Sequence, residues 1–201
     1  MSDDTQIKPV RGPIIVSRHG RPSLNRSAGP RLTWQEYRDW WDRYEASSLA
    51  EDQKPPESLK AKVSGIDVVL SSVRTRAIET ARWATDGREP EQYPVFNEAP
   101  LPPPRLKGRT YLPKTWNVLA RMVWLRGHSL DTETVEEARL RAREAAERLH
   151  EAAEGQSVYL AAHGWFNRML RKPLKQLGWV CVRDGGDKYW SYRVYEYRGK
   201  S

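Results

Sequence analysis

Apolar and polar residues along this chain follow two periods, one typical of β-strands and one typical of α-helices. Short runs of β-branched and other apolar residues predict buried strands at residues 13–17, 66–70, 95–96 and 157–162. Residues 189–197 alternate aromatic and polar side chains, which predicts a last strand at an edge of the sheet. Stretches of helical periodicity separate these runs, so strands and helices are expected to alternate along the chain.

The clearest helical pattern lies between residues 133 and 154, where alanine and larger apolar residues recur every three or four positions before Gly155. A second begins at Thr33-Trp34-Gln35-Glu36, which has the form of a capping box and is followed by aromatic residues at helical spacing. Helices are therefore expected at residues 33–50, 75–82, 133–154 and 165–177.

This alternation predicts an α/β fold, a three-layer α/β/α sandwich around a mostly parallel sheet. Residues 1–12 lack any periodicity and are expected to form a flexible tail before a single domain at 13–201. A cap of helix and loop is expected at about 99–130, where consecutive prolines at 102–104 favour an extended loop. In such a sheet, ligands bind outside the carboxyl ends of the strands.

Composition indicates a water-soluble globular protein. The 201 residues are 38% hydrophobic and 30% charged, with a mean hydropathy of −0.80. No run approaches the roughly 20 apolar residues that cross a bilayer, and the first residues are polar, so a cytoplasmic location without membrane contact is expected. Cys181 is the only cysteine, which excludes an internal disulfide and agrees with a reducing compartment.

The positive charge favours an anionic partner. A formal net charge of +8 and a pI near 9.7 attract anions but do not distinguish a phosphate ester from a nucleic acid or an acidic protein. Nucleic acid is disfavoured because the basic residues are scattered along the chain and no nucleic-acid-binding motif is present.

Chemically active residues follow four of the predicted strands. Arg18-His19 ends the first, the turn at 72–76 ends the second, Glu98 follows the third and His163 ends the fourth. The turn leads straight into a helix, whose free amides and positive dipole end suit a phosphate group. A metal site is the alternative, but a single acidic residue accompanies these groups and arginine side chains repel a metal ion.

Taken together, these residues resemble the histidine phosphatase superfamily, which includes cofactor-dependent phosphoglycerate mutases and many small phosphatases. The likeness runs from about residue 13 to 175. It is carried by Arg18-His19-Gly20 with Asn25, by the segment 72–80 from Ser72 to Thr80, by Glu98, and by His163-Gly164 with Arg168.

The resemblance implies a role for each matching residue. His19 would be the nucleophile and Glu98 the proton donor. Arg18, Arg76 and His163 would hold the phosphoryl oxygens, and Arg76 takes this position because it directly precedes Ala77. The other residues expected around the phosphate are Asn25, Gly164 and Arg21. Arg21, Arg105, Lys107 and Arg109 either bind a second anionic group of the substrate or are solvated loop charges.

Departures from the family pattern narrow the expected activity. Mutases have Glu-Ser after Arg-His-Gly and a Thr-Gly-Trp segment soon after, whereas this chain has Arg21-Pro22-Ser23 and no such segment. The acid phosphatase branch has Asp after its second His, where this chain has Gly164. We therefore expect a phosphatase that cleaves a small-molecule phosphate ester through a phosphohistidine, with no metal or cofactor. A catalytically weak module that binds a phospho-ligand or a protein is the alternative. The sequence leaves the substrate and the oligomeric state open.

Overall fold

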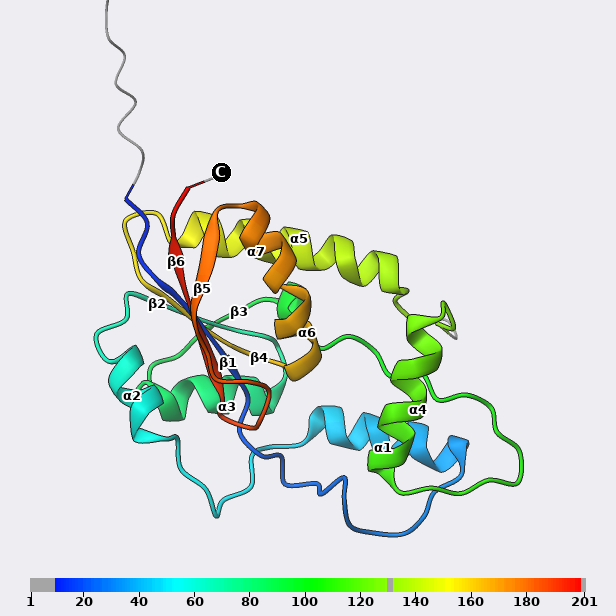
Figure 1. Cartoon of the computed structure of the whole chain (residues 1–201). Helices are drawn as coiled ribbons and strands as arrows, with labels where there is room; N and C mark the ends of the chain where they lie inside the picture. Colours follow the sequence, from blue (N-terminus) through cyan, green and yellow to red (C-terminus); the bar gives the residue numbers. More distant parts are fainter. Residues whose placement is uncertain (1–9, 130–131, 200–201) are drawn as a thin grey trace, which may run out of the picture.

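A six-stranded sheet forms the centre of the molecule (Figure 1). The computed structural model describes residues 10–129 and 132–199. The sheet has the order β3-β2-β4-β1-β6-β5. Its strands are β1 (Ile14–Arg18), β2 (Val68–Ser71), β3 (Glu91–Gln92), β4 (Val158–Ala162), β5 (Trp179–Asp184) and β6 (Tyr192–Tyr197).

The sheet is mostly parallel, as expected from the alternation of strands and helices. β4 runs parallel to both β1 and β2, and β2 runs parallel to β3. β6 is antiparallel to both of its neighbours, β1 and β5. The carboxyl ends of β1, β2 and β4 therefore lie together at one edge of the sheet.

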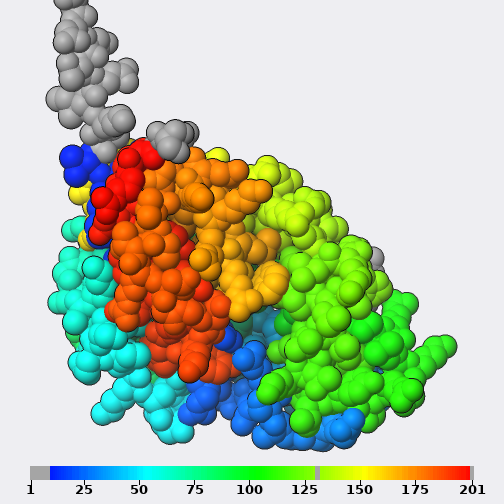
Figure 2. All heavy atoms as spheres, viewed as in Figure 1, coloured from blue at the N-terminus to red at the C-terminus, as the bar shows by residue number. Residues whose placement is uncertain are grey.

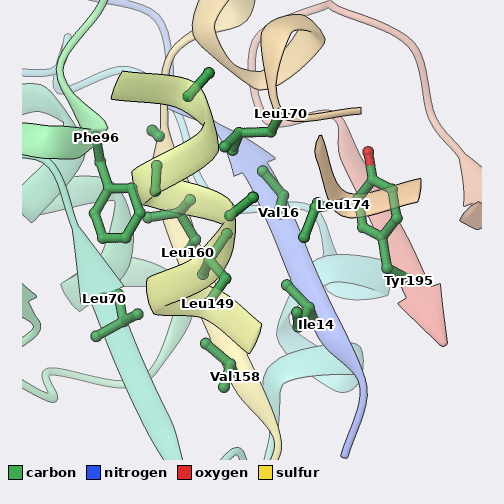
Figure 3. Packing of buried hydrophobic residues seen from close by; sticks show 14 of the residues in the cluster. Ile14, Val16, Leu70, Phe96, Leu149, Val158, Leu160, Leu170, Leu174 and Tyr195 are labelled. Carbon is green, nitrogen blue, oxygen red and sulfur yellow. The ribbon is translucent and has the colours of Figure 1, made fainter. Parts of the chain in front are cut away.

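Helices cover both faces of the sheet and complete the three layers (Figure 1). On one face, a cluster of small and large apolar side chains from α5, α6 and α7 packs against β1, β2 and β4 (Figure 3). On the other face, α2 and α3 pack against the opposite sides of the same strands. The helices are α1 (Trp34–Ala46), α2 (Glu57–Val63), α3 (Thr75–Ala84), α4 (Pro113–Leu125), α5 (Val135–Ala152), α6 (Gly164–Met169) and α7 (Arg171–Gln176).

Two helices, α1 and α4, lie outside the layers near the carboxyl ends of β1 and β4 (Figure 1). They share a separate aromatic cluster in which Tyr37, Trp40 and Tyr44 of α1 meet Trp116 of α4. The predicted capping box is present, with Thr33 as the N-cap, so α1 begins at the next residue, Trp34. The cap thus combines α4 from the expected insertion with α1 from a distant part of the chain.

Two predictions about the strands are wrong. Residues 95–96 belong to a 3₁₀ helix, Pro94–Phe96, because Pro94 has no N–H for a sheet ladder; the strand β3 lies just before it. The last strand is not at the edge, since β6 lies between β1 and β5. β5 was not predicted, because Val180 and Val182 are both exposed and the strand shows no alternation of apolar and polar residues.

Several boundaries also differ from the prediction. The helix expected at 165–177 is two short helices, α6 and α7, and Pro173 in the second has no N–H to donate to the preceding turn. α2 was not predicted. A flexible tail was expected at 1–12, and its residues 1–9 lie outside the described residues. Residues 10–12 are hydrogen-bonded to the loop after α5: the Gly12 amide donates to the Ala153 carbonyl at 3.0 Å, and the Gly155 amide donates to the Val10 carbonyl at 2.9 Å.

Proline residues 102–104 lie in a segment without helix or strand, as expected. None of the helices in the described ranges is both long enough and apolar enough to cross a membrane.

Candidate active site

The register of the sheet places the two histidines side by side. Arg18 at the end of β1 is level with Ala162 at the end of β4, so the next residues, His19 and His163, are neighbours. The His19 amide donates to the Ala162 carbonyl at 2.9 Å, and the two imidazole rings lie 5.2 Å apart between centroids. Three separated motifs therefore meet where β1, β4 and β2 end.

The hydrogen bonds of His19 define its tautomer. Nδ1 lies 2.7 Å from the Gly20 carbonyl oxygen, and Nε of Arg76 lies 3.4 Å from Nε2. A guanidinium N–H can only donate, so Nε2 accepts, and the ring proton is assigned to Nδ1, which donates to Gly20. Nε2 is therefore the nitrogen with a lone pair available for a bond to an electrophile.

The same reasoning assigns the proton on His163. Its Nδ1 lies 3.3 Å from Nη2 of Arg76 and accepts, so Nε2 carries the proton and donates to the Ser72 hydroxyl at 2.7 Å. Burial lowers the pKa of both histidines well below the ordinary value of 6.5, and the positive charge of Arg76 lowers both further. Both imidazoles are therefore neutral at physiological pH.

Arg76 is the most enclosed cation of the site, with 1% of its surface exposed. Two of its nitrogens, Nε and Nη2, approach the two histidines as described above. Its Nη1 donates to the carbonyls of Tyr44 at 3.3 Å and Glu45 at 2.9 Å, and Nη2 also donates to the Glu45 carboxylate at 2.6 Å. The residue lies in the first turn of α3, which follows β2, as the strand-to-helix transition in the sequence indicated.

Arg18 approaches the same space from the opposite side. Its Nη1 donates to the Asp187 carbonyl at 2.6 Å, and its guanidinium lies 4.3 Å from the centre of the Tyr189 ring. Within the described residues its Nε is buried and has no hydrogen-bond partner. Gly164 makes room for this side chain, because a Cβ there would lie 3.1 Å from Nε of Arg18. Arg18 thus has a buried donor available for an anionic ligand.

Glu98 is fixed at the start of α6. Its Oε1 accepts from the amides of Phe166 at 2.8 Å and Ala99 at 3.0 Å, and its Oε2 accepts from Trp165 at 3.1 Å. Since α6 begins directly after His163, these bonds fix the carboxyl group relative to the second histidine.

Most of these residues line one open cavity of about 640 Å³, whereas His163 is fully buried and is not among the lining residues. His19, Arg18, Arg76, Glu98 and Gly164 all contribute to its wall. Figure 2 shows the surface hollowed between α6 and α4, where this cavity opens. Further cations reach it from Arg26, Lys114, Arg121 and Arg168, so the cavity favours an anionic ligand. Among residues 10–129 and 132–199, no three His, Cys, Asp or Glu side chains gather as a metal site would require.

Other residues expected at the phosphate lie elsewhere. Asn25 is exposed, and its side-chain oxygen accepts from the Ser27 amide at 2.8 Å. Arg21 is exposed and pairs with Asp52 at 2.5 Å. Neither is among the residues that line the cavity, and the same holds for Arg105, Lys107 and Arg109. Arg26, next to Asn25, does line it.

A model of the histidine phosphatase superfamily, branch 1, matches residues 14–200. The chain belongs to this superfamily. A search by sequence among curated proteins finds no match.

Solved structures of similar fold include several phosphatases. One is a putative alpha-ribazole-5'-P phosphatase from Escherichia coli, with a TM-score of 0.57 and 15% identity over 94% of this chain and 96% of that one. Another is a phosphoserine phosphatase from Entamoeba histolytica in complex with 3-phosphoglyceric acid, with a TM-score of 0.56 and 14% identity over 82% and 80%. YhfR from Bacillus stearothermophilus gives 0.56 and 21% over 82% and 80%. At these identities the likeness concerns the fold.

Among the groups that contact Arg18 and Arg76, three were not found from the sequence. Glu45 lies in the last turn of α1, and Asp187 and Tyr189 lie in the loop between β5 and β6. The Tyr189 ring lies 5.7 Å from that of His19 and also faces Arg18. No motif marks these positions. A carboxylate at the end of an aromatic-faced helix was the one available signal, and it is equally typical of a solvent-exposed residue.

Proposed function

We propose that the protein is a metal-independent phosphomonoesterase that forms a covalent phosphohistidine at His19. The observation that carries this proposal is the neutral, buried His19 whose unprotonated Nε2 lies 3.4 Å from Nε of Arg76. A neutral imidazole attacks phosphorus without first losing a proton to another base. Superfamily membership and the cationic cavity around this nitrogen support the same chemistry.

In the first step, the lone pair on Nε2 forms a bond to phosphorus as the bond from phosphorus to the ester oxygen breaks. The leaving oxygen takes a proton from the Glu98 carboxyl group. Oε2 of Glu98 accepts one amide hydrogen bond, from Trp165, so it keeps a lone pair that can carry this proton.

In the second step, water attacks the phosphohistidine. The Glu98 carboxylate takes a proton from this water, the N–P bond breaks, and its electron pair returns to Nε2. The products are the alcohol, inorganic phosphate and the enzyme in its starting protonation state.

Charge develops on the equatorial phosphoryl oxygens in both steps. Arg18, with its unpartnered Nε, and Arg76 supply fixed positive charge, and His163 lies beside them. Donors held in place before the reaction stabilise the transition state by several kcal/mol when water is excluded.

Turnover and labelling of a His19→Ala variant test the proposal. We expect wild-type protein to hydrolyse an aryl phosphate in the presence of a chelator and to give an acid-labile phosphoprotein. His19→Ala should lose both properties, by at least about 10³-fold in kcat, because no other group replaces the nucleophile. His128→Ala is a matched control, since His128 is exposed and does not line the cavity.

Three results would contradict the proposal. Absence of wild-type turnover across a broad panel of phosphate esters would favour the binding module over the enzyme. Labelling that survives in His19→Ala would place the nucleophile elsewhere. Interconversion of phosphoglycerate isomers by the wild type would identify a mutase instead of a hydrolase.

A further inference from the structure

Glu45 binds both arginines of the segment that follows β2. Its Oε1 accepts from Nη2 of Arg76 at 2.6 Å, and its Oε2 lies 2.9 Å from Nε of Arg74 in an ion pair. The Glu45 side chain is 12% exposed, whereas that of Arg74 is 39% exposed. The Glu45–Arg76 pair is therefore largely shielded from water, and the Arg74 pair reaches the surface.

All five N–H groups of Arg76 have acceptors in this arrangement. Nη1 donates to the carbonyls of Tyr44 and Glu45. Nη2 donates to the Glu45 carboxylate and to Nδ1 of His163. Nε donates to Nε2 of His19. The end of α1 accepts three of the five, and the two histidines accept the others.

The end of α1 therefore holds one side of the guanidinium, and its Nε faces Nε2 of His19. The carbonyls of Tyr44 and Glu45 lie in the last turn of α1, where the helix dipole is negative and favours a cation. The Tyr44 ring lies 5.2 Å from the guanidinium carbon. A rigid planar guanidinium bound at one side by an acid and two carbonyls has little freedom to turn.

We propose that Glu45 is a positioning residue that orients Arg76 so that Nε and Nη2 meet the phosphoryl group beside His19. This inference rests on the proposed function and adds a residue to it that touches no substrate atom. Glu45 also supplies the counter-charge that a buried arginine requires while no phosphate is bound. The last turn of the cap helix is thereby part of the catalytic arrangement.

The opposite role would be competition, in which the carboxylate occupies a donor that the phosphate needs. The bonds favour positioning, because the nitrogen nearest the nucleophile, Nε, makes no bond to Glu45. Positioning and competition predict opposite effects on the binding of phosphate, so binding measurements distinguish them.

The test compares Glu45→Gln and Glu45→Ala in the full chain. The glutamine keeps an oxygen that can accept from Nη2 of Arg76, and Arg74 is exposed enough to turn into solvent. We expect Glu45→Gln to retain kcat/KM for an aryl phosphate within about threefold. Glu45→Ala should lose about 10- to 100-fold, mostly in kcat, because a misplaced transition-state donor affects the chemical step most.

Binding of inorganic phosphate, measured by calorimetry, provides a readout that needs no turnover. We expect Glu45→Ala to bind phosphate about tenfold more weakly than wild type and Glu45→Gln to bind it nearly as tightly. Asp39→Asn is the matched control for loss of a carboxylate from α1, since Asp39 is exposed and does not line the cavity. It should behave as wild type in both assays.

Tighter phosphate binding by Glu45→Ala would overturn the proposal in favour of competition. Equal behaviour of Glu45→Ala and wild type would also overturn it. If Glu45→Ala does not fold, Glu45→Asp takes its place, since its carboxylate is one methylene shorter and should also weaken phosphate binding. A wild type that hydrolyses no ester but gives the expected order of phosphate affinities would refute the proposed function and support the positioning role.

Discussion

At the scale of single residues, the site depends on imidazoles that stay neutral. Burial and the charges of Arg76 and Arg18 lower the pKa of His19, and burial and Arg76 act in the same direction on His163. Cations beside a neutral nucleophile prevent its protonation and at the same time attract an anionic substrate. In the proposed mechanism, the same two arginines keep His19 neutral and attract the substrate.

Glu98 is tested by a substitution that keeps its shape. Glu98→Gln retains an oxygen for the amides of α6 but has no acidic proton to transfer. We expect kcat for alkyl phosphates, whose leaving oxygen needs a proton, to fall about 10²- to 10⁴-fold. Aryl phosphates have stabilised leaving groups and should lose about tenfold or less in the first step. Equal losses for both ester classes in single-turnover assays would contradict a role as general acid.

At the scale of elements, α4 provides an apolar part of the cavity wall. Val118, Met122 and Leu125 line the cavity, and they are 56%, 45% and 48% exposed. They lie three or four positions apart, so they share one face of α4. Lys114, on the same helix, also lines the cavity. Under the proposed function, we expect this wall to contact the leaving group of the ester.

We expect the apolar wall to affect kcat/KM across a series of n-alkyl phosphates. Leaving-group reactivity changes little from propyl to hexyl phosphate, so kcat/KM should rise with the apolar surface that is buried, by up to about threefold per methylene. Met122→Ser should lower kcat/KM for hexyl phosphate about fivefold and leave that for methyl phosphate within about twofold.

Leu140→Ser is the matched control for this experiment. Leu140 is 59% exposed on α5 and does not line the cavity, so its substitution should leave the series unchanged. A flat dependence on chain length in the wild type would show that the leaving group does not contact α4.

At the scale of the whole molecule, the two buried histidines couple stability to pH. Their pKa values are ordinary, near 6.5, in the unfolded chain and well below that in the folded protein. Below pH 6.5 the unfolded chain therefore binds more protons than the folded one. The free energy of unfolding is highest above this pH and declines as the pH falls toward the folded pKa values, by up to about 1.4 kcal/mol per pH unit for each histidine.

Denaturant unfolding between pH 7 and pH 5 measures this decline. His163→Gln removes one of the two titrating groups. We therefore expect the histidine contribution to the slope of unfolding free energy against pH to fall by about half in this variant. His128→Ala should keep the full slope because its side chain is exposed. An unchanged slope in His163→Gln would contradict the assignment of His163 as a buried neutral base.

Much of the layered fold could be predicted from the sequence, because buried strands and amphipathic helices have periodic patterns. β1, β4 and α5 were predicted to within about two residues of their bounds. The edge strand β5 was missed because its exposed valines do not alternate with polar residues, and the run at 95–96 was misassigned because Pro94 favours a turn. Both errors occur where the pattern of apolar and polar residues does not match the secondary structure that the backbone adopts.

By itself, the sequence determined that His19 and His163 follow buried strands and that Arg76 lies where a strand leads into a helix, since local pattern marks these boundaries. The tertiary structure decided which ends are adjacent. The sheet order brings β4 between β1 and β2, and so His163 between His19 and Ser72. It also brought Glu45 to Arg76 and Tyr189 to Arg18 from segments without a motif. Such contacts join residues far apart in the chain, and they depend on packing, which local sequence does not encode.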